Sequence, residues 1–394
     1  MLAVEKEKIL NIPPATDEEI KEAMQHAIRQ TESCLPEFSD TFKSSVADDK
    51  GFYHEAKNEQ WTNGFWTGEL WLAYENTGDE RFKKAAMGQV ESFLRRIEEN
   101  IETDTHDLGF LYSLSCVAAY KLTGDKKARK AAMMAADKLL SRFQEKGQFI
   151  QAWGALDDTS EYRLLINSLA NLPLLFWASE ESGDERYEKA ARAHLETTLR
   201  VVVRHDYSTH HTYYFDPETG APLYGETHQG YSDDSSWARG QAWGIYGLAI
   251  AYRYTKDPDY MKMFFNVTEY FLEHLPHDLI PHWDLIFRGG STEPRDSSSS
   301  AITVCGMLEM AKYVDKEQAE TLKSFARRLM HMLIEKCAVT DPEESNGQLK
   351  HGVYSRKSPF NNTPDRGVDT CNLWGDYYYV EALTRLSGDW EPYW

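Results

Sequence analysis

Two kinds of helical segment alternate along the chain. The first kind is apolar and aromatic on all sides, as in GFWTGELWLAYE (64–75) and RGQAWGIYGLAIAY (239–252). The second kind has one charged face, as in DERFKKAAMGQVESFLRRIEE (79–99). A helix that is apolar all round is buried, whereas a single apolar stripe leaves the other face in solvent. The alternation therefore predicts inner helices that are each paired with an outer helix.

Similar turns separate the two kinds of helix and recur as a repeat. Three segments share Gly-Asp before a helical, alanine-rich stretch: ENTGDERFKKAA (75–86), KLTGDKKARKAA (121–132) and ESGDERYEKAA (181–191). Weaker copies lie at 254–264, 313–325 and 386–394. Glycine tolerates the left-handed end of a helix, and the following aspartate can cap the next helix. These corners predict six helix pairs.

Six pairs predict an all-α fold, a single (α/α)6 barrel that spans residues 1–394. The last repeat ends almost at its turn, so its outer helix is missing downstream. The amphipathic segment 17–34 is unpaired upstream and supplies that helix if the ring closes N-terminus onto C-terminus. The alternative is an open array, a noncatalytic helical-repeat protein that binds peptides on a concave face.

The stretch EYRLLINSLANLPLL (161–175) is apolar at nearly every turn and predicts a buried inner helix. Asn167 and Asn171 interrupt it one helical turn apart. A buried amide without partners costs about 1–3 kcal/mol. We therefore expect Asn167 to face a central pocket and Asn171 to make a hydrogen bond behind it.

Composition and charge exclude several classes of function. The net charge of −20 and the lack of a basic stripe argue against nucleic-acid binding. No apolar run is long enough for a membrane span or a signal sequence. The five cysteines form no C-x-x-C pair, which indicates neither a zinc site nor a disulfide framework. We expect a cytoplasmic monomer or weak dimer that uses no metal and no cofactor.

Polar residues collect at the N-terminal ends of the predicted inner helices, which share one face of a barrel. Free N–H groups and the helix dipole favour an anion there. The segments are QWTNGFW (60–66), DTHDLGF (104–110), EYRLLIN (161–167), DDSSWARGQAW (233–243), EPRDSSSS (293–300) and DRGVDTCN (365–372). Aromatic residues lie among them and favour a carbohydrate that carries a carboxylate: Trp61, Phe65, Trp153, Trp237 and Trp243.

Several of these residues have a structural interpretation beside the functional one. Asp107 has the position of an N-terminal cap, as do Asp233 and Asp234 before the fourth inner helix. Arg239 lies within an apolar helix, where it either pairs with an internal acid or binds a substrate carboxylate. His211 precedes a strand-like run, and a surface position is the default for such a histidine.

Three motifs and the six-repeat layout resemble the unsaturated glucuronyl hydrolases: THDLGFLY (105–112), the H-T-x-x-F-D run (211–216) and THQGYSDDSSWARGQAW (227–243). The resemblance implies a glycoside hydrolase that acts on lyase-generated disaccharides of the chondroitin, hyaluronan or heparin type. Such substrates carry a C4=C5 double bond in the terminal uronic acid. The implied reaction is hydration of this vinyl ether, in which an acidic residue protonates C4 and water adds at C5, rather than direct attack at the anomeric carbon.

By the same resemblance, the acid/base aspartate of the family matches Asn167. Asp107 matches a second aspartate, which positions the substrate and raises the pKa of the first. The other residues implied fall into three groups: His106, Trp237, Arg239 and Trp243 for the uronate carboxylate and ring, His211 and Gln229 near the attacking water, and Trp61, Phe65 and Trp153 as stacking walls.

The chain departs from the family at two places. An amide neither gives a labile proton to carbon nor takes one from water, and general acid–base catalysis contributes about 10²–10⁴-fold. With Asn167, this chain is therefore expected to be an inactive, substrate-trapping variant. Members that accept sulfated disaccharides carry a Ser-x-x-Ser-x-Lys pattern, whereas Ser355 and Ser358 precede Phe360 here. Loss of the lysine predicts that unsulfated disaccharides bind at least as readily as sulfated ones.

Two enzymatic alternatives remain. The unsaturated rhamnogalacturonyl hydrolases share the fold and the chemistry, but their motifs match less well. A sugar epimerase with the same barrel would use paired histidines on its inner helices, and only His106 comes near such a position.

Overall fold

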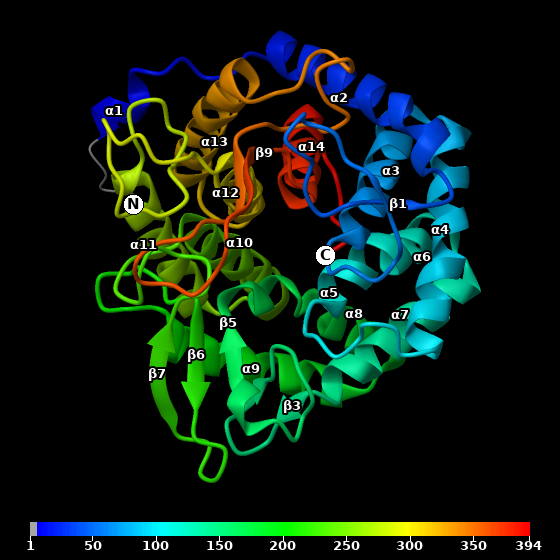
Figure 1. Ribbon diagram of the computed structural model, residues 1–394, viewed down its shortest axis with the longest axis vertical. Helices are drawn as coiled ribbons and strands as arrows, with labels where there is room; N and C mark the ends of the chain where they lie inside the picture. The colour runs from blue at the N-terminus through cyan, green and yellow to red at the C-terminus, as the bar shows by residue number, and fades with distance from the viewer. Residues whose placement is uncertain (1–5) are drawn as a thin grey trace.

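The computed structural model describes residues 6–394 and arranges their helices as two concentric rings (Figure 1). Within this range six inner helical segments alternate with six outer helices, as the repeat predicts. The inner ring contains α3 (Asn63–Thr77), α5 (Leu108–Tyr112) with α6 (Ala118–Thr123), α8 (Pro173–Ser182), α10 (Ala238–Thr255), α12 (Ser297–Met310) and α14 (Leu373–Ser387). The outer ring contains α2 (Asp17–Phe38), α4 (Glu80–Glu98), α7 (Lys126–Leu140), α9 (Glu185–Val202), α11 (Pro258–His274) and α13 (Lys316–Lys336).

Short helical pieces accompany the two rings. The short helix α1 (Lys6–Leu10) precedes the rings. A π-helical stretch, Ser113–Val117, joins α5 to α6 within one inner segment.

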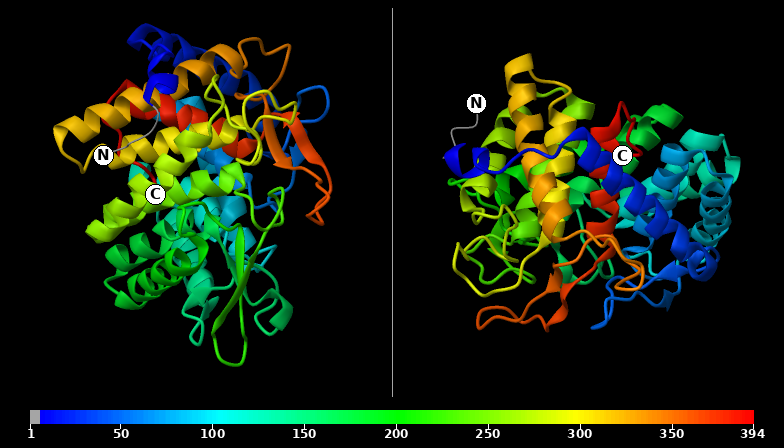
Figure 2. Two further views of the ribbon diagram at one scale, coloured as in Figure 1. Left: turned by 90° about the vertical axis from the view of Figure 1, so that its left-hand side faces the viewer. Right: turned by 90° about the horizontal axis from the view of Figure 1, so that it is seen from above.

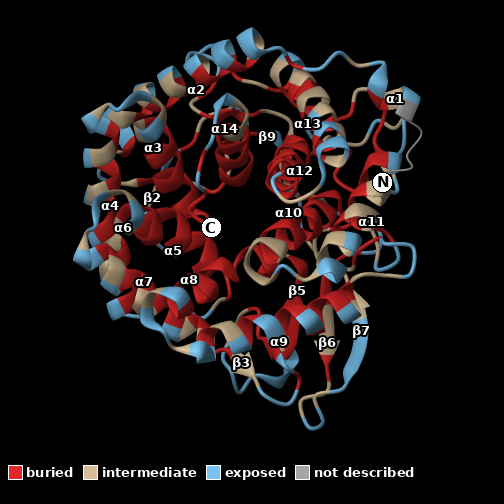
Figure 3. Cartoon of the chain, turned by 180° about the vertical axis from the view of Figure 1, so that it is seen from behind, coloured by how far each residue is buried: buried red, intermediate tan, exposed pale blue. Residues whose placement is uncertain are grey.

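The two rings differ in burial as the hydrophobic pattern predicts (Figure 3). Every residue of α12 is buried. The outer helix α4 instead buries one stripe, including Phe82, Val90 and Phe93, and turns charged residues toward solvent. The inner ring is therefore enclosed between the outer ring and the barrel axis.

The corners between helices have the conformation that the Gly-Asp repeat predicts. Gly78 ends α3 with φ 70°, in the left-handed region that glycine adopts without strain. Asp79 then caps α4 by accepting a hydrogen bond from Arg81 N at 2.9 Å. The same arrangement recurs at Gly124–Asp125 and at Gly183–Asp184.

The ring is closed rather than open. The last inner helix, α14, packs on the first inner helix, α3, and also on α2. The segment predicted at 17–34 is thus the outer helix of the last pair and extends to Phe38. This closure excludes the open helical array.

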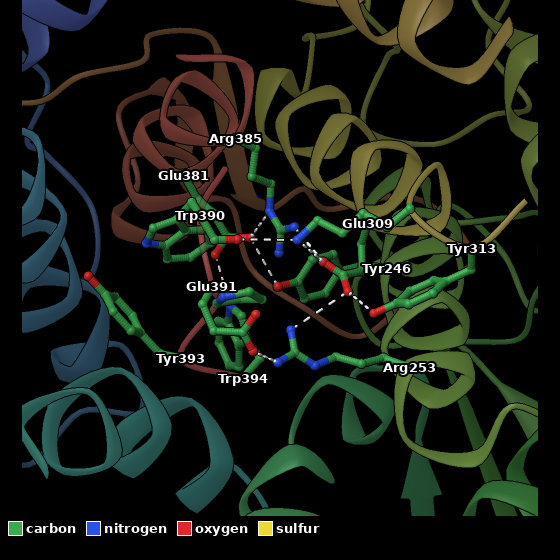
Figure 4. Close-up of polar contacts among 12 residues, drawn as sticks. Tyr246, Arg253, Glu309, Tyr313, Glu381, Arg385, Trp390, Glu391, Tyr393 and Trp394 are labelled. Carbon is green, nitrogen blue, oxygen red and sulfur yellow. Dashed lines mark hydrogen bonds and ion pairs between the residues drawn. The ribbon is translucent and has the colours of Figure 1, made fainter. Parts of the chain in front are cut away.

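The C-terminal segment covers one end of the barrel. Trp394 is fully buried, stacks on Tyr378 with ring centroids 6.0 Å apart, and donates to Glu381 at 2.8 Å. Glu381 also accepts from Arg385, which pairs with Glu309 at 2.6 Å (Figure 4). The turns that carry the strands lie toward the other end of the barrel (Figure 2).

Short antiparallel strands form part of those turns. The largest sheet joins β5 (Arg163–Leu165), β6 (Thr212–Phe215) and β7 (Pro222–Glu226), with Leu165 opposite Thr212. The strand-like run after His211 is therefore confirmed as β6. Three two-stranded pairs complete the set: β1 (Phe42–Lys43) with β2 (Glu55–Ala56), β3 (Phe143–Gln144) with β4 (Phe149–Ile150), and β8 (Gly352–Ser355) with β9 (Arg366–Thr370).

The prediction of one continuous helix over 161–175 is wrong. Residues 163–165 form β5, Ile166–Ala170 make a short 3-10 turn, and α8 begins only at Pro173. The apolar run is buried as a strand because β6, about fifty residues later, supplies the hydrogen-bonding partner. Proline lacks an N–H group and fits the first position of a helix, so Pro173 marks the true start.

Candidate active site

A cavity of about 350 Å³ opens at the end of the barrel where the inner segments begin. Its lining comes from the turns before α3 and α5, from β5 and the 3-10 turn, from the start of α10 and from β8. The lining residues are Trp61, Asp107, Trp153, Leu165, Asn167, His211, His228, Gln229, Trp237, Arg239, Trp243 and Tyr354. Nine of these twelve residues were predicted from the sequence as site residues.

An amide–carboxylate pair lies in this cavity. Asn167 Nδ2 donates to Asp107 Oδ1 at 3.1 Å, while Asn167 Oδ1 is buried and has no hydrogen-bond partner among the described residues. Asp107 precedes α5, but its carboxylate makes no capping hydrogen bond to that helix. Asp107 instead lines the cavity, so the interpretation of its side chain as a helix cap is wrong.

Asn171 supports this pair from behind, as predicted. Its Oδ1 accepts from Phe110 N at 2.7 Å, and its Nδ2 lies 3.4 Å from Asp107 Oδ1 and 3.2 Å from Asn167 O. These contacts satisfy the buried amide and fix α5 against the 3-10 turn. The two asparagines are therefore part of one network.

Two histidines of the cavity are neutral and have defined roles in hydrogen bonding. His211 Nδ1 accepts from the backbone N–H groups of His228 and Gln229, at 3.0 and 3.2 Å, so its proton lies on Nε2. Burial, together with neighbouring positive groups, lowers the pKa of His211 well below its usual value. Burial and Arg163 lower the pKa of His228 to about 4. His211 is buried, contrary to the default surface position.

Arg239 is paired within the protein. Its Nη1 contacts Asp296 at 2.6 Å, its Nη2 donates to Tyr354 O at 2.7 Å, and the guanidinium lies 4.5 Å from the Trp237 ring centroid. The first of the two predicted alternatives, an internal acid, is therefore the one observed. Arg239 still reaches the cavity lining, where its charge is balanced by Asp296.

Aromatic rings form the walls. Trp61 stacks on Trp374 with ring centroids 5.3 Å apart and donates through Nε1 to the Tyr354 hydroxyl at 3.1 Å. Trp243 packs against Phe110 at 5.1 Å. Such rigid, partly polar walls suit a sugar ring.

Four predicted site residues lie outside the cavity lining. Phe65 is fully buried and packs edge-on against Trp61 at 5.9 Å, so it supports the wall from behind. His106 is buried, and its Nε2 lies 3.3 Å from Asp107 Oδ1 without hydrogen-bonding geometry. Neither residue lines the cavity.

The two serines of the predicted sulfate motif, Ser355 and Ser358, make hydrogen bonds within the protein. Ser355 Oγ donates to Pro364 O at 2.8 Å, and Ser358 Oγ donates to Tyr231 O at 2.6 Å. Ser358 Oγ also accepts from two backbone N–H groups, which holds its loop in place. Phe360 is 62% exposed beside them. These serines lie outside the cavity lining, and their hydroxyls bind backbone carbonyls, that of Pro364 in the same loop and that of Tyr231 far along the chain.

The expected caps of the fourth inner helix are also wrong. Asp233 Oδ1 accepts from Thr227 N at 2.8 Å, Asp234 is exposed, and α10 begins after Trp237 without a side-chain cap. The isolated bridge between Trp237 and Asp284 brings the chain into the helix instead.

Sequence reasoning missed Leu165, His228 and Tyr354. His228 lies within the quoted THQ motif, beside the predicted Gln229, and that motif is the signal that could have found it. Tyr354 comes from β8, far along the chain, and no local pattern marks it.

The described part of the chain contains no group of three or more His, Cys, Asp or Glu residues placed to hold a metal ion. None of its helices is both long and apolar enough to cross a membrane. All five cysteines are free and buried.

A closed (α/α)6 barrel with a carboxylate at an aromatic-walled pocket fits a glycoside hydrolase of the barrel type, and the match to a known family establishes that class. Residues 37–385 match Glycosyl Hydrolase Family 88, and the chain belongs to that family.

Individual relatives agree with this assignment. The chain is 48% identical over 392 residues to the unsaturated chondroitin disaccharide hydrolase of Streptococcus pneumoniae, covering 98% of this chain and 97% of that protein. It is 40% identical over 377 residues to the unsaturated glucuronyl hydrolase of a Bacillus species, covering 95% and 98%.

Solved structures show the same likeness. The crystal structure of unsaturated glucuronyl hydrolase from Streptococcus agalactiae has a TM-score of 0.95 at 47% identity, covering 100% of this chain and 98% of that one. An aspartate-to-asparagine variant of that enzyme complexed with dGlcA-GalNAc6S has a TM-score of 0.87 at 44% identity, with the same coverage.

Proposed function

We propose that the pocket binds the unsaturated uronate of a lyase-generated glycosaminoglycan disaccharide, and that its chemistry is hydration of the C4=C5 vinyl ether. One observation carries this proposal. The side chain at position 167 and the Asp107 carboxylate lie 3.1 Å apart inside an aromatic-walled cavity of about 350 Å³. Relatives named for unsaturated chondroitin disaccharides and unsaturated glucuronyl substrates support the substrate class.

The reaction needs a carboxylic acid at position 167. Such an acid gives its proton to C4, water forms a bond to C5, and the proton released from that water returns to the carboxylate. The resulting hemiketal then opens and releases the remaining sugar. The Asp107 carboxylate raises the pKa of an acid placed so close to it, which keeps that acid protonated before the reaction.

The attacking water needs both a donor and an acceptor. His211 offers Nε2–H, because its Nδ1 is occupied by two backbone N–H groups. Gln229 Nε2 donates to Tyr354 O at 3.0 Å, which leaves Oε1 as an acceptor. These two residues can therefore orient one water molecule in the cavity.

With Asn167 in place, the chain holds its substrate without turning it over. Asparagine has nearly the shape of aspartate, so the contact with Asp107 and the cavity persist. It has no labile proton for C4, and it cannot accept the proton of the water. We therefore propose that this chain is a substrate-trapping variant.

Substrates without sulfate fit this chain at least as well as sulfated ones. The hydroxyls of Ser355 and Ser358 donate to backbone carbonyls of the protein, those of Pro364 and Tyr231, and the ring of Phe360 is exposed. The names of the relatives do not favour an unsaturated rhamnogalacturonyl substrate. The free, buried cysteines support a cytoplasmic location, and a monomer or weak dimer is proposed with it.

A binding titration tests the proposal. Calorimetry with the unsulfated unsaturated chondroitin disaccharide should show binding at one site, while the near-UV absorbance of the alkene stays constant. The saturated disaccharide is the matched control ligand and should bind more weakly, because its uronate ring is puckered differently. Equal binding of a peptide panel, or no binding of the unsaturated disaccharide, would refute the proposed substrate class.

A further inference from the structure

A buried chain of hydrogen bonds lies directly behind Asn167. The next residue, Ser168, donates from Oγ to Leu165 O at 2.6 Å. The same oxygen lies 2.7 Å from His194 Nε2 on α9. Ser168 is 1% exposed and His194 is fully buried, so neither residue touches solvent.

The donor and the acceptor of each hydrogen bond in this series can be assigned. Ile150 N–H donates to His194 Nδ1 at 2.8 Å, which places the imidazole proton on Nε2. That proton is given to Ser168 Oγ at 2.7 Å, and the Ser168 hydroxyl proton goes to Leu165 O. Thr198 Oγ1 lies farther from Nε2, at 3.3 Å, and gives its own proton to His194 O at 2.8 Å. Burial, and after it the neighbouring His106, lowers the pKa of His194 to about 3, which favours the neutral imidazole at neutral pH.

The segment held by these hydrogen bonds is a short turn that depends on contacts with other elements, among them the Asn171 contacts with α5. Ile166–Ala170 is a single 3-10 turn, a geometry with weaker hydrogen bonds than an α-helix. Its backbone is tied by Ile166 N to His211 O at 3.0 Å and by Asn171 N to Ser168 O at 2.9 Å. His194 connects this turn to two rigid elements, α9 and the end of β4.

We propose that His194 is a positioning residue, which acts through Ser168 to fix the turn that presents residue 167 to Asp107. The inference rests on the proposed function, because position 167 matters for turnover only if it carries the acid. A displacement of about 1 Å in a reacting group costs up to about 10²-fold in rate, so the hold on this turn is a catalytic requirement.

Two conservative variants separate positioning from stability, each made in the Asn167→Asp protein. His194→Asn keeps an acceptor for Ile150 N–H but cannot reach Ser168, whereas His194→Gln keeps a donor toward Ser168 but loses the acceptor. Each variant loses one buried hydrogen bond. We expect kcat to fall about 10- to 100-fold in His194→Asn with KM within about twofold, and to stay within about threefold in His194→Gln. Ser168→Ala should match His194→Asn, and the double variant should be no slower.

Hydrogen–deuterium exchange of residues 163–172 is a second readout that needs no turnover. Exchange there should rise in His194→Asn and not in His194→Gln. Thr197→Ala, a buried change on the same helix, should alter neither kcat nor this exchange. Equal kcat in the two His194 variants, or equal exchange, overturns the inference. Failure of Asn167→Asp itself to turn over substrate refutes the proposed function instead, and the exchange data then still decide whether His194 holds the turn.

Discussion

Acid should destabilise the fold through His194. The side chain is fully buried, and its pKa is lowered to about 3 by burial and by His106, whereas an unfolded histidine titrates near 6.5. Between these two values the unfolded chain binds a proton that the folded chain does not, so the free energy of unfolding falls as the pH falls. For this group, linkage gives a loss of about 2 kcal/mol between about pH 7.5 and about pH 5.

Urea unfolding at both pH values measures this loss. Other groups also titrate. The loss in free energy of unfolding on acidification is therefore compared between the parent chain and His194→Gln. The chain should lose about 2 kcal/mol more than His194→Gln on acidification. The matched control is His205→Gln, an exposed substitution that should lose as much as the parent chain. If the chain and His194→Gln lose the same free energy, the neutral, buried state of His194 is refuted.

Two further predictions concern the far end of the barrel and the serine loop. Glu309→Gln should lower the free energy of unfolding by about 1–3 kcal/mol, because it removes the charge 2.6 Å from the buried Arg385, which keeps Glu381 as its other partner at 2.8 Å. A loss below about 1 kcal/mol in urea unfolding would contradict this. Calorimetry with a matched pair of disaccharides should show the unsulfated one binding at least as tightly as the 6-sulfated one, and Phe360→Lys should raise the affinity for the sulfated one alone. A strong sulfate preference in the parent chain would contradict this prediction.

The barrel itself could be predicted because its signals are local. The Gly-Asp corners fix where three of the inner segments end, as Gly78 and Asp79 show, and these features depend on neighbouring residues only. Closure followed from counting helices, since the helix at 17–38 had no other partner. The helix predicted at 161–175 was wrong because the signal for its true structure is not local. Its strand character depends on β6, and a short apolar run does not tell strand from helix.

Site residues could be predicted where a local sequence motif marks them. They could not be predicted where their role depends on a partner far along the chain. Asp107 and Asn167 lie in recognisable segments, and the structure brings their side chains to 3.1 Å from each other. The partner of Arg239 is Asp296, at the start of another inner helix, and no spacing rule connects the two positions. The same limit applies to His194, whose role appears only when α9 is packed on the 3-10 turn.

The central claim is that this pocket lacks only the acid at position 167. The most direct test compares initial rates of alkene loss for the chain and for Asn167→Asp, with the unsulfated unsaturated chondroitin disaccharide as substrate. The account predicts a rise of at least about 10²-fold, the lower range of general acid–base catalysis, with a binding affinity within a few-fold of the parent. Asn171→Asp is the matched control and should stay inactive, because residue 171 lies behind the cavity lining. No gain of turnover in Asn167→Asp, with binding retained, would contradict the account.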